Sequence, residues 1–134
     1  MKTKINKQLL TVFFLVLLSS GFLTQQAQAQ EDQTELVRVY YFHFNTRCAT
    51  CKAVESEAQQ DVKELFGNDV SFAAYNLDEK EGEAKGKELG VDSQSLIVVK
   101  GTEKIDLTNE GFLYALTDPE KFRQIIEEKI APLL

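Results

Sequence analysis

The 134-residue sequence is poor in several residue types that particular functions require. It has two cysteines, one histidine, two prolines and no tryptophan. Two cysteines and one histidine cannot complete a four-ligand zinc site without a carboxylate or a second subunit. The longest apolar run, residues 9–18 with Thr11 inside it, is well short of the roughly 20 residues of a membrane-spanning helix.

Basic residues are also scarce relative to acidic ones, 15 against 21. An acidic protein repels the phosphates of nucleic acids and the headgroups of anionic lipids. We therefore expect no nucleic-acid partner and, because of the short apolar run, no stable membrane insertion of the mature chain.

The first 29 residues have the organisation of a secretory signal peptide. Three lysines precede the apolar run, and the segment ends in Ala-Gln-Ala at positions 27–29, the small-residue pattern of a cleavage site. We predict export to the periplasm or beyond the cell, with cleavage after Ala29. Cleavage would remove three lysines and no acid, leaving 12 basic and 21 acidic residues and a net charge of −9.

The remaining 105 residues predict one domain. Residues 30–35 are polar, and we expect a flexible arm there, followed by the folded domain at 36–134. A chain of this size can bury a core without a disulfide.

Hydrophobic patterning in the domain predicts alternating strands and helices. We expect strands at 36–44, 70–77, 95–100 and 104–108, and helices at 48–66, 78–89 and 117–130. The order β-α-β-α-β-β-α predicts an α/β fold with a four-stranded mixed sheet. Its first two strands should be parallel, and its faces should be covered by helices. Residues 111–116 are apolar but short, and we interpret them as a turn of helix or a packed loop.

The last helix carries a start signal. Thr117 is its expected N-cap, Pro119 lies in the first turn, and Glu120 follows the cap by three residues. This pattern is a capping box.

Cys48 and Cys51 are three residues apart, after the first strand and at the predicted start of a helix. As a structural staple the pair would close a loop of four residues, which stabilises a fold by only about 2 kcal/mol. As a metal site it would suit a soft two-coordinate ion. As a redox pair it would exchange disulfides, which suits an exported chain.

The placement favours exchange. A helix N-terminus stabilises a thiolate, and Arg47 and Lys52 add positive charge that would lower the pKa of the Cys48 thiol. Thr50 has a hydroxyl that could bond a sulfur. We predict that Cys48 is the exposed nucleophile and that Cys51, on the buried side of the helix, resolves the mixed disulfide.

The strand and loop "YYFHFNTRCATCK", at 40–52, resemble the active-site segment of the thioredoxin-like superfamily. The resemblance covers residues 36–134 and implies a thioredoxin-like fold with a redox-active disulfide and no organic cofactor. With "SLIVV" at 95–99, the sequence is also similar to small secreted bacterial proteins labelled as a nitrophenyl-compound nitroreductase subunit family. That label implies nitro-group reduction, but the chain has no flavin or nicotinamide fingerprint.

Two positions depart from the thioredoxin pattern. Ser95 stands where that family has a cis-proline, and we predict a trans bond because a non-proline cis bond costs about 2.5–4 kcal/mol. The Ser95 hydroxyl would either bond a sulfur or ligand or simply begin the strand. Phe42 stands where the family has a proton-accepting carboxylate, so water, Tyr41 or His43 would have to serve. We interpret His43 as a core residue rather than a catalytic one.

The sequence thus predicts a monomeric thiol–disulfide oxidoreductase acting on periplasmic protein thiols and disulfides. Thr50, where oxidising relatives have histidine, favours a reducing or isomerising direction. One alternative is a carrier that binds a soft metal or metalloid through Cys48 and Cys51. Another is a non-catalytic subunit of a larger secreted enzyme, with Phe112, Leu113 and Tyr114 as an exposed apolar patch.

Overall fold

The computed structural model describes residues 35–134, so the predicted signal peptide (1–29) and all but the last residue of the predicted arm (30–35) lie outside the described residues. The elements follow in the order β1 (Val37–His43), α2 (Ala49–Phe66), β2 (Val70–Asn76), α3 (Lys80–Leu89), β3 (Ser95–Lys100), β4 (Glu103–Asp106), α4 (Thr108–Tyr114), α5 (Pro119–Ile130) and the 3₁₀ turn η1 (Ala131–Leu133). The predicted strands and long helices are all present, with ends shifted by one or two residues.

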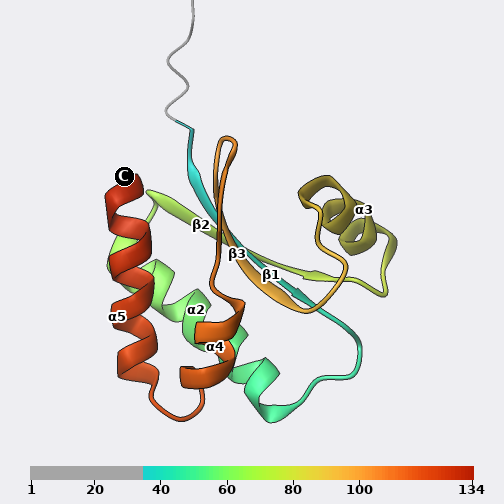
Figure 1. The fold of residues 1–134 in the computed structure, drawn as a ribbon, viewed down its shortest axis with the longest axis horizontal. Helices are drawn as coiled ribbons and strands as arrows, with labels where there is room; N and C mark the ends of the chain where they lie inside the picture. The colour runs from blue at the N-terminus through green and yellow to red at the C-terminus, as the bar shows by residue number, and fades with distance from the viewer. Residues whose placement is uncertain (1–34) are drawn as a thin grey trace, which may run out of the picture. The chain divides into compact units, whose positions relative to one another are not determined.

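The four strands form one mixed sheet in the order β2-β1-β3-β4 (Figure 1). Strand β1 pairs in parallel with β2 from Val37↔Val70 to His43↔Asn76. It pairs antiparallel with β3, where Phe42 lies opposite Ser95. The predicted α/β class is confirmed, and the topology agrees with the predicted thioredoxin-like arrangement.

Helices cover both faces of the sheet, as predicted. Successive side chains of a strand point to opposite faces. On one face Tyr41 joins the core that α2, α4 and α5 complete. On the other face Lys85 of α3 lies over the Tyr40 ring, 5.2 Å from its centroid. Phe42 stacks there on Tyr75, with centroids 5.8 Å apart.

Helix α4 spans Thr108–Tyr114, whereas the sequence predicted only a turn of helix or a packed loop at 111–116. Its start is held by Asp106, whose carboxylate accepts the Thr108 backbone N–H at 2.9 Å. Gly111 lowers the helix propensity of this segment, but a Cβ there would lie 3.1 Å from Val54 of α2. The glycine therefore allows α4 to pack closely on α2.

The predicted capping box of the last helix is wrong by one residue. The N-cap is Asp118, whose carboxylate accepts the Lys121 N–H. Thr117 instead donates its hydroxyl to the Leu113 carbonyl at 2.7 Å. It therefore closes the turn that follows α4, whose extent the sequence pattern did not indicate.

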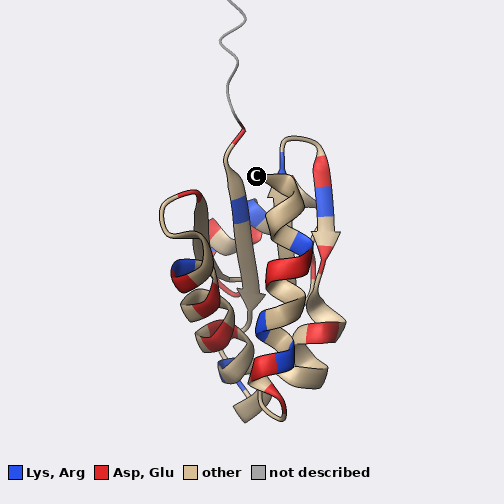
Figure 2. Cartoon of the chain, turned by 90° about the vertical axis from the view of Figure 1, so that its left-hand side faces the viewer, with Lys and Arg blue, Asp and Glu red and all other residues tan. Residues whose placement is uncertain are grey.

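Charged residues are mixed along the helices. Figure 2 shows acidic and basic residues interspersed along the ribbon. On α3, Lys87 pairs with Glu83 at 2.6 Å and Lys85 with Glu88 at 2.9 Å. Within residues 35–134, no helix is long and apolar enough to cross a membrane.

Asp61 is the buried acid that links α2 to α5. It is 4% exposed, and its Oδ1 accepts from Arg123 Nη1 at 2.8 Å. The same guanidinium nitrogen bonds Glu64 at 2.8 Å. Burial raises the pKa of Asp61, and the hydrogen bond and charge of Arg123 offset only part of that effect.

This raised pKa predicts a specific pH dependence of stability. The folded protein binds the Asp61 proton at a higher pH than the unfolded chain does, so the free energy of unfolding should fall as pH rises between the two pKa values. Asp61→Asn should remove this contribution, while Glu64→Gln, at the exposed end of the same pair, should retain it. Denaturant unfolding from about pH 3 to pH 7 measures how the free energy of unfolding changes with pH in each variant. An equal pH dependence in wild type and Asp61→Asn would contradict the assignment of this contribution to Asp61.

Candidate functional site

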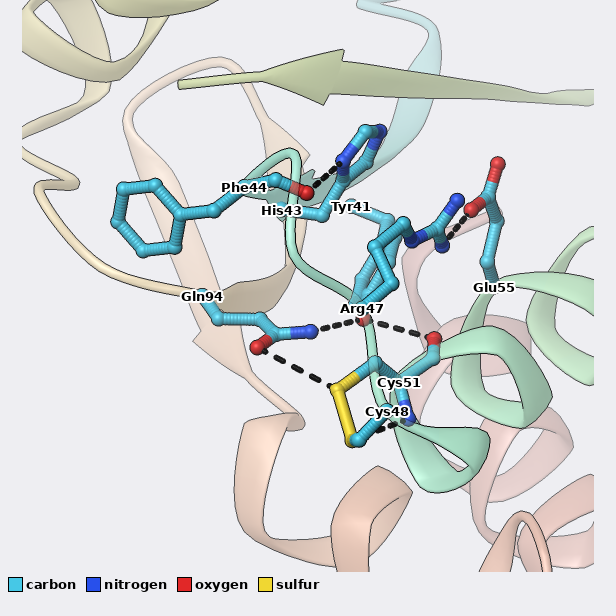
Figure 3. The surroundings of a disulfide bond; sticks show 8 residues. All are labelled: Tyr41, His43, Phe44, Arg47, Cys48, Cys51, Glu55 and Gln94. Atoms are coloured by element: carbon cyan, nitrogen blue, oxygen red, sulfur yellow. Dashed lines mark hydrogen bonds and ion pairs between the residues drawn. A yellow bond between two sulfur atoms is a disulfide. The ribbon is translucent and has the colours of Figure 1, made fainter. Parts of the chain in front are cut away.

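The two cysteines form a disulfide at the start of α2. Cys48 is the N-cap, with extended backbone, and Cys51 lies in the first turn. The sulfurs are 2.13 Å apart and the Cα atoms 5.1 Å apart (Figure 3). The Cys51 backbone N–H donates to Cys48 Sγ at 3.1 Å. The predicted placement of the pair at a helix N-terminus is confirmed.

The two sulfurs differ in access. Cys48 is exposed, whereas Cys51 is 5% exposed and shares a buried helix face with Val54 and Ala58. An incoming molecule therefore meets Cys48 first. This asymmetry follows from helix periodicity, because the N-cap lies at the surface while a residue three positions later faces the core.

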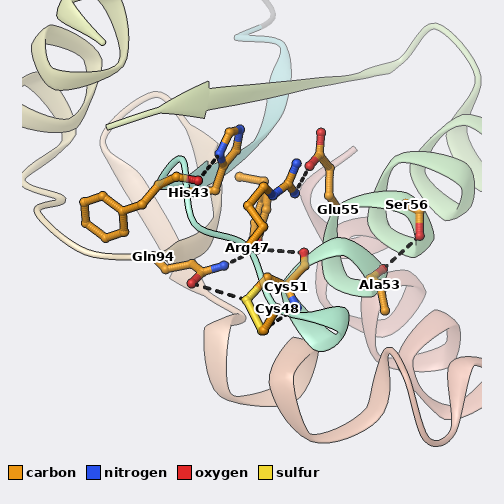
Figure 4. A network of polar contacts seen from close by, with 10 residues as sticks. His43, Arg47, Cys48, Cys51, Ala53, Glu55, Ser56 and Gln94 are labelled. Carbon is orange, nitrogen blue, oxygen red and sulfur yellow. Dashed lines mark hydrogen bonds and ion pairs between the residues drawn. A yellow bond between two sulfur atoms is a disulfide. The ribbon is translucent and has the colours of Figure 1, made fainter. Parts of the chain in front are cut away.

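A polar network joins Cys51 to two other segments of the chain. The Tyr41 hydroxyl, fully buried on β1, donates to the Cys51 carbonyl at 2.8 Å. Gln94, just before β3, donates from Nε2 to the Tyr41 oxygen at 2.6 Å. Its Oε1 lies 3.6 Å from Cys51 Sγ (Figure 4). One amide thus contacts both the hydroxyl and the buried sulfur.

The residue beneath Cys51 is Tyr41, not Phe42. Counting six residues back from Cys48 pointed to Phe42, but strand alternation turns Phe42 to the opposite face, where it stacks on Tyr75. Burial raises the pKa of Tyr41, opposed in part by its hydrogen bond from Gln94 and by the Arg47 charge. Tyr41 is therefore a neutral phenol whose proton is engaged, and it does not fit the role of proton acceptor.

Arg47 is paired away from the sulfurs. Its guanidinium forms an ion pair with Glu55, one turn beyond Cys51, and lies 5.8 Å from the centre of the Tyr41 ring. Figure 3 shows it pointing toward Glu55 and away from the disulfide. Its charge is therefore largely offset before it reaches Cys48, in contrast to the role expected from the sequence.

The other predicted supporting residues have more local roles. Lys52 is exposed, and its backbone N–H bonds the Cys48 carbonyl at 3.1 Å. Thr50 is half-buried in the first turn of α2. Ser95 donates its hydroxyl to the Ser93 carbonyl at 3.0 Å, as a strand-start residue does. The sulfur contact, which the sequence offered as one role for the serine, is made by its neighbour Gln94.

The described peptide bonds are all trans, including that between Gln94 and Ser95, as predicted. His43 is partly buried rather than a core residue. Its Nδ1 lies 3.0 Å from the Phe44 carbonyl, and its ring points away from the disulfide in Figure 3. No described group of three or more potential ligands is arranged to hold a metal ion.

The apolar patch predicted on α4 is only partly exposed. Phe112 and Tyr114 pack against the core, while Leu113 is 61% exposed and Leu116 just beyond the helix is 51% exposed. The surface available to a larger enzyme is therefore smaller than the three consecutive apolar residues indicated.

Comparisons with known proteins leave the family open. No family model matches the chain, and no curated protein matches it. A solved structure titled "Structure of a malarial protein" is 18% identical, with a TM-score of 0.43, and the match covers 60% of this chain and 93% of that one.

The Arg47–Glu55 pair predicts how the Cys48 thiolate responds to mutation. Arg47→Met should leave the Glu55 carboxylate unpaired and move the midpoint of Cys48 thiolate formation up. Glu55→Gln should leave the guanidinium unpaired and move the midpoint down by roughly 0.5 pH unit. The double variant Arg47→Met/Glu55→Gln removes a neutral pair and should change the midpoint little. The ultraviolet absorbance of the thiolate in the reduced protein measures all three values. A large upward shift in the double variant would show that Arg47 acts on the sulfur despite Glu55.

Proposed function

We propose that this protein is an exported thiol–disulfide oxidoreductase with a thioredoxin-like fold. Cys48 is the sulfur that exchanges with partners, and Cys51 is the resolving sulfur. The proposal depends on the contrast between an exposed Cys48 at the N-cap of α2 and a buried Cys51 in the first turn. A bridge that served only as a staple would gain nothing from exposing one of its sulfurs.

The environment of Cys48 suits an attacking thiolate. The Cys51 N–H already points at Cys48 Sγ, and a hydrogen bond to a charged acceptor is about twice as strong as one to a neutral acceptor. The first turn of α2 contains no acidic side chain that would oppose the positive end of the helix dipole. Reduction of the disulfide therefore leaves a sulfur that is stabilised as an anion and open to solvent.

The exchange balances without a cofactor. In one direction, the Cys48 thiolate attacks a partner disulfide, forms a mixed disulfide and releases one partner thiolate. Cys51 then loses its proton to solvent and attacks Cys48 Sγ, which releases the second partner thiolate and restores the Cys48–Cys51 bond. The reverse sequence oxidises a partner dithiol. The partners are exported proteins with thiols or disulfides, and the protein acts as a monomer.

A carrier of a soft metal or metalloid is the second candidate. Serine at position 95, after a trans bond, replaces the cis-proline that shields the cysteines of thioredoxins from metals, and no acid among residues 35–134 lies beneath Cys51 to assist exchange. Two thiolates three residues apart at a helix start suit a two-coordinate ion such as copper(I), or arsenite. Tight stoichiometric binding of these probes by the reduced protein, without disulfide reductase activity, would favour the carrier.

Mixed-disulfide trapping tests the proposed exchange. Cys51→Ser should accumulate covalent adducts with exported proteins, because Cys48 still attacks but nothing resolves the product. Cys48→Ser should accumulate none, because the remaining thiol is buried. Non-reducing gels followed by identification of the adducts measure both.

A matched control is available in the same turn. Thr50→Ser leaves both sulfurs in place and should trap no more than wild type. Equal trapping by the two cysteine variants, or by neither, would contradict the assigned roles of the sulfurs.

A further inference from the structure

The amide of Gln94 has a fixed orientation. The Tyr41 proton is directed at the Cys51 carbonyl, so the Tyr41 oxygen can only accept from Gln94. The amide nitrogen of Gln94 must therefore face Tyr41, at 2.6 Å. Its carbonyl oxygen is left facing Cys51 Sγ, at 3.6 Å. The direction of this amide follows from the network, because an amide turned the other way would place its carbonyl oxygen against the Tyr41 oxygen, two acceptors with no proton between them.

The contact between Gln94 Oε1 and Cys51 Sγ changes character with redox state. In the disulfide, Sγ carries no hydrogen, and the oxygen has nothing to accept. In the reduced protein, the Cys51 thiol is a donor beside a pre-positioned acceptor, at a separation suited to a sulfur hydrogen bond. The hydrogen bond thus exists only in the dithiol.

We infer that Gln94 is a positioning residue that biases the Cys48–Cys51 pair toward the dithiol by accepting a hydrogen bond from the reduced Cys51 thiol. The inference rests on the proposed function and adds the preferred direction of electron flow. An interaction made only in the reduced form stabilises that form. The disulfide is therefore a stronger oxidant of partner thiols than it would be without Gln94. This direction is opposite to the one that Thr50 suggested from sequence.

The favoured step can be written with its electrons and protons. A partner thiolate attacks the exposed Cys48 Sγ, the Cys48–Cys51 bond breaks, and its electron pair leaves on Cys51 Sγ. That sulfur takes a proton from solvent and donates it in the hydrogen bond to Gln94 Oε1. A second partner thiolate then attacks the mixed disulfide, and Cys48 leaves as a thiolate that keeps its hydrogen bond from the Cys51 N–H. The partner is oxidised to a disulfide, and the pair is reduced.

The surroundings of Gln94 hold its side-chain oxygen in place as the hydrogen-bond acceptor. Gln94 is partly buried and lies next to buried Ser95 at the start of β3, while Tyr41 is fully buried. The acceptor is therefore in place before the bond breaks, and little reorganisation is needed to form the new hydrogen bond. An amide also adds no negative charge beside the Cys48 thiolate, unlike a carboxylate at the same position.

The redox equilibrium with glutathione tests the inference. The oxidised fraction of the pair is measured across a series of glutathione ratios at neutral pH. Gln94→Leu should favour the disulfide, raising the equilibrium constant for oxidation by glutathione disulfide about threefold to tenfold. This corresponds to a potential lowered by about 15–30 mV for a two-electron couple. Tyr41→Phe, which frees the amide to rotate, should shift the constant in the same direction by a smaller factor.

Gln60→Leu is the matched control. This glutamine is exposed on α2 and donates to Glu64, so its removal should leave the potential unchanged. A wild-type potential in Gln94→Leu, or an equal shift in Gln60→Leu, would overturn the inference. Should Gln94→Leu not fold, Tyr41→Phe carries the test, and its wild-type potential would be equally decisive. Failure of the wild-type pair to exchange with glutathione or with any partner would instead refute the proposed function.

Discussion

The buried hydroxyl of Tyr41 is the constraint on which the arrangement of the site depends. It lies on the central strand, donates to the first turn of α2, and accepts from the segment that leads into β3. A buried polar group left without a partner costs about 1–3 kcal/mol of folding stability. The need to satisfy the Tyr41 hydroxyl therefore holds these segments together. Loss of either hydrogen bond would leave a polar atom of this network without its partner. The surroundings of the sulfurs are therefore set by the folding of the domain.

The first strand and helix were predictable because their sequence signals agree with their tertiary context. The apolar run before Cys48 and the three- and four-residue spacing after Cys51 each describe an element whose core face matches its local preference. The exposure of Cys48 and burial of Cys51 follow from the same periodicity. By contrast, α4 has a glycine at its centre, and its helical form depends on packing against α2, which sequence periodicity does not report.

The site residues that prediction missed are those whose role arises from long-range geometry. Gln94 is 43 residues from Cys51 along the chain, and nothing in its immediate sequence marks it. The contact arises because β3 pairs antiparallel with β1 and brings the start of β3 beside the end of β1. Arg47 was identified from its proximity in sequence, yet its geometry directs it to Glu55. The family spacing pointed to Phe42 as the residue beneath Cys51. Side chains alternate between the two faces of a strand, however, and the residue on the Cys51 side is Tyr41.

The chemistry of the site follows from giving two identical side chains opposite surroundings. Cys48 faces solvent and a backbone donor, both of which favour its anion. Cys51 faces the core and an uncharged acceptor, both of which favour its protonated form. In the proposed exchange, separation of this kind gives Cys48 the attacking role and Cys51 the resolving role without a dedicated acid beneath the helix. It also means that in this exchange the Cys51 proton must leave to solvent, since no described side chain that contacts this sulfur is placed to accept it. A partner that donates electrons avoids this step, because in that direction Cys51 only gains a proton, and the missing carboxylate and the Gln94 amide therefore favour the same direction of exchange.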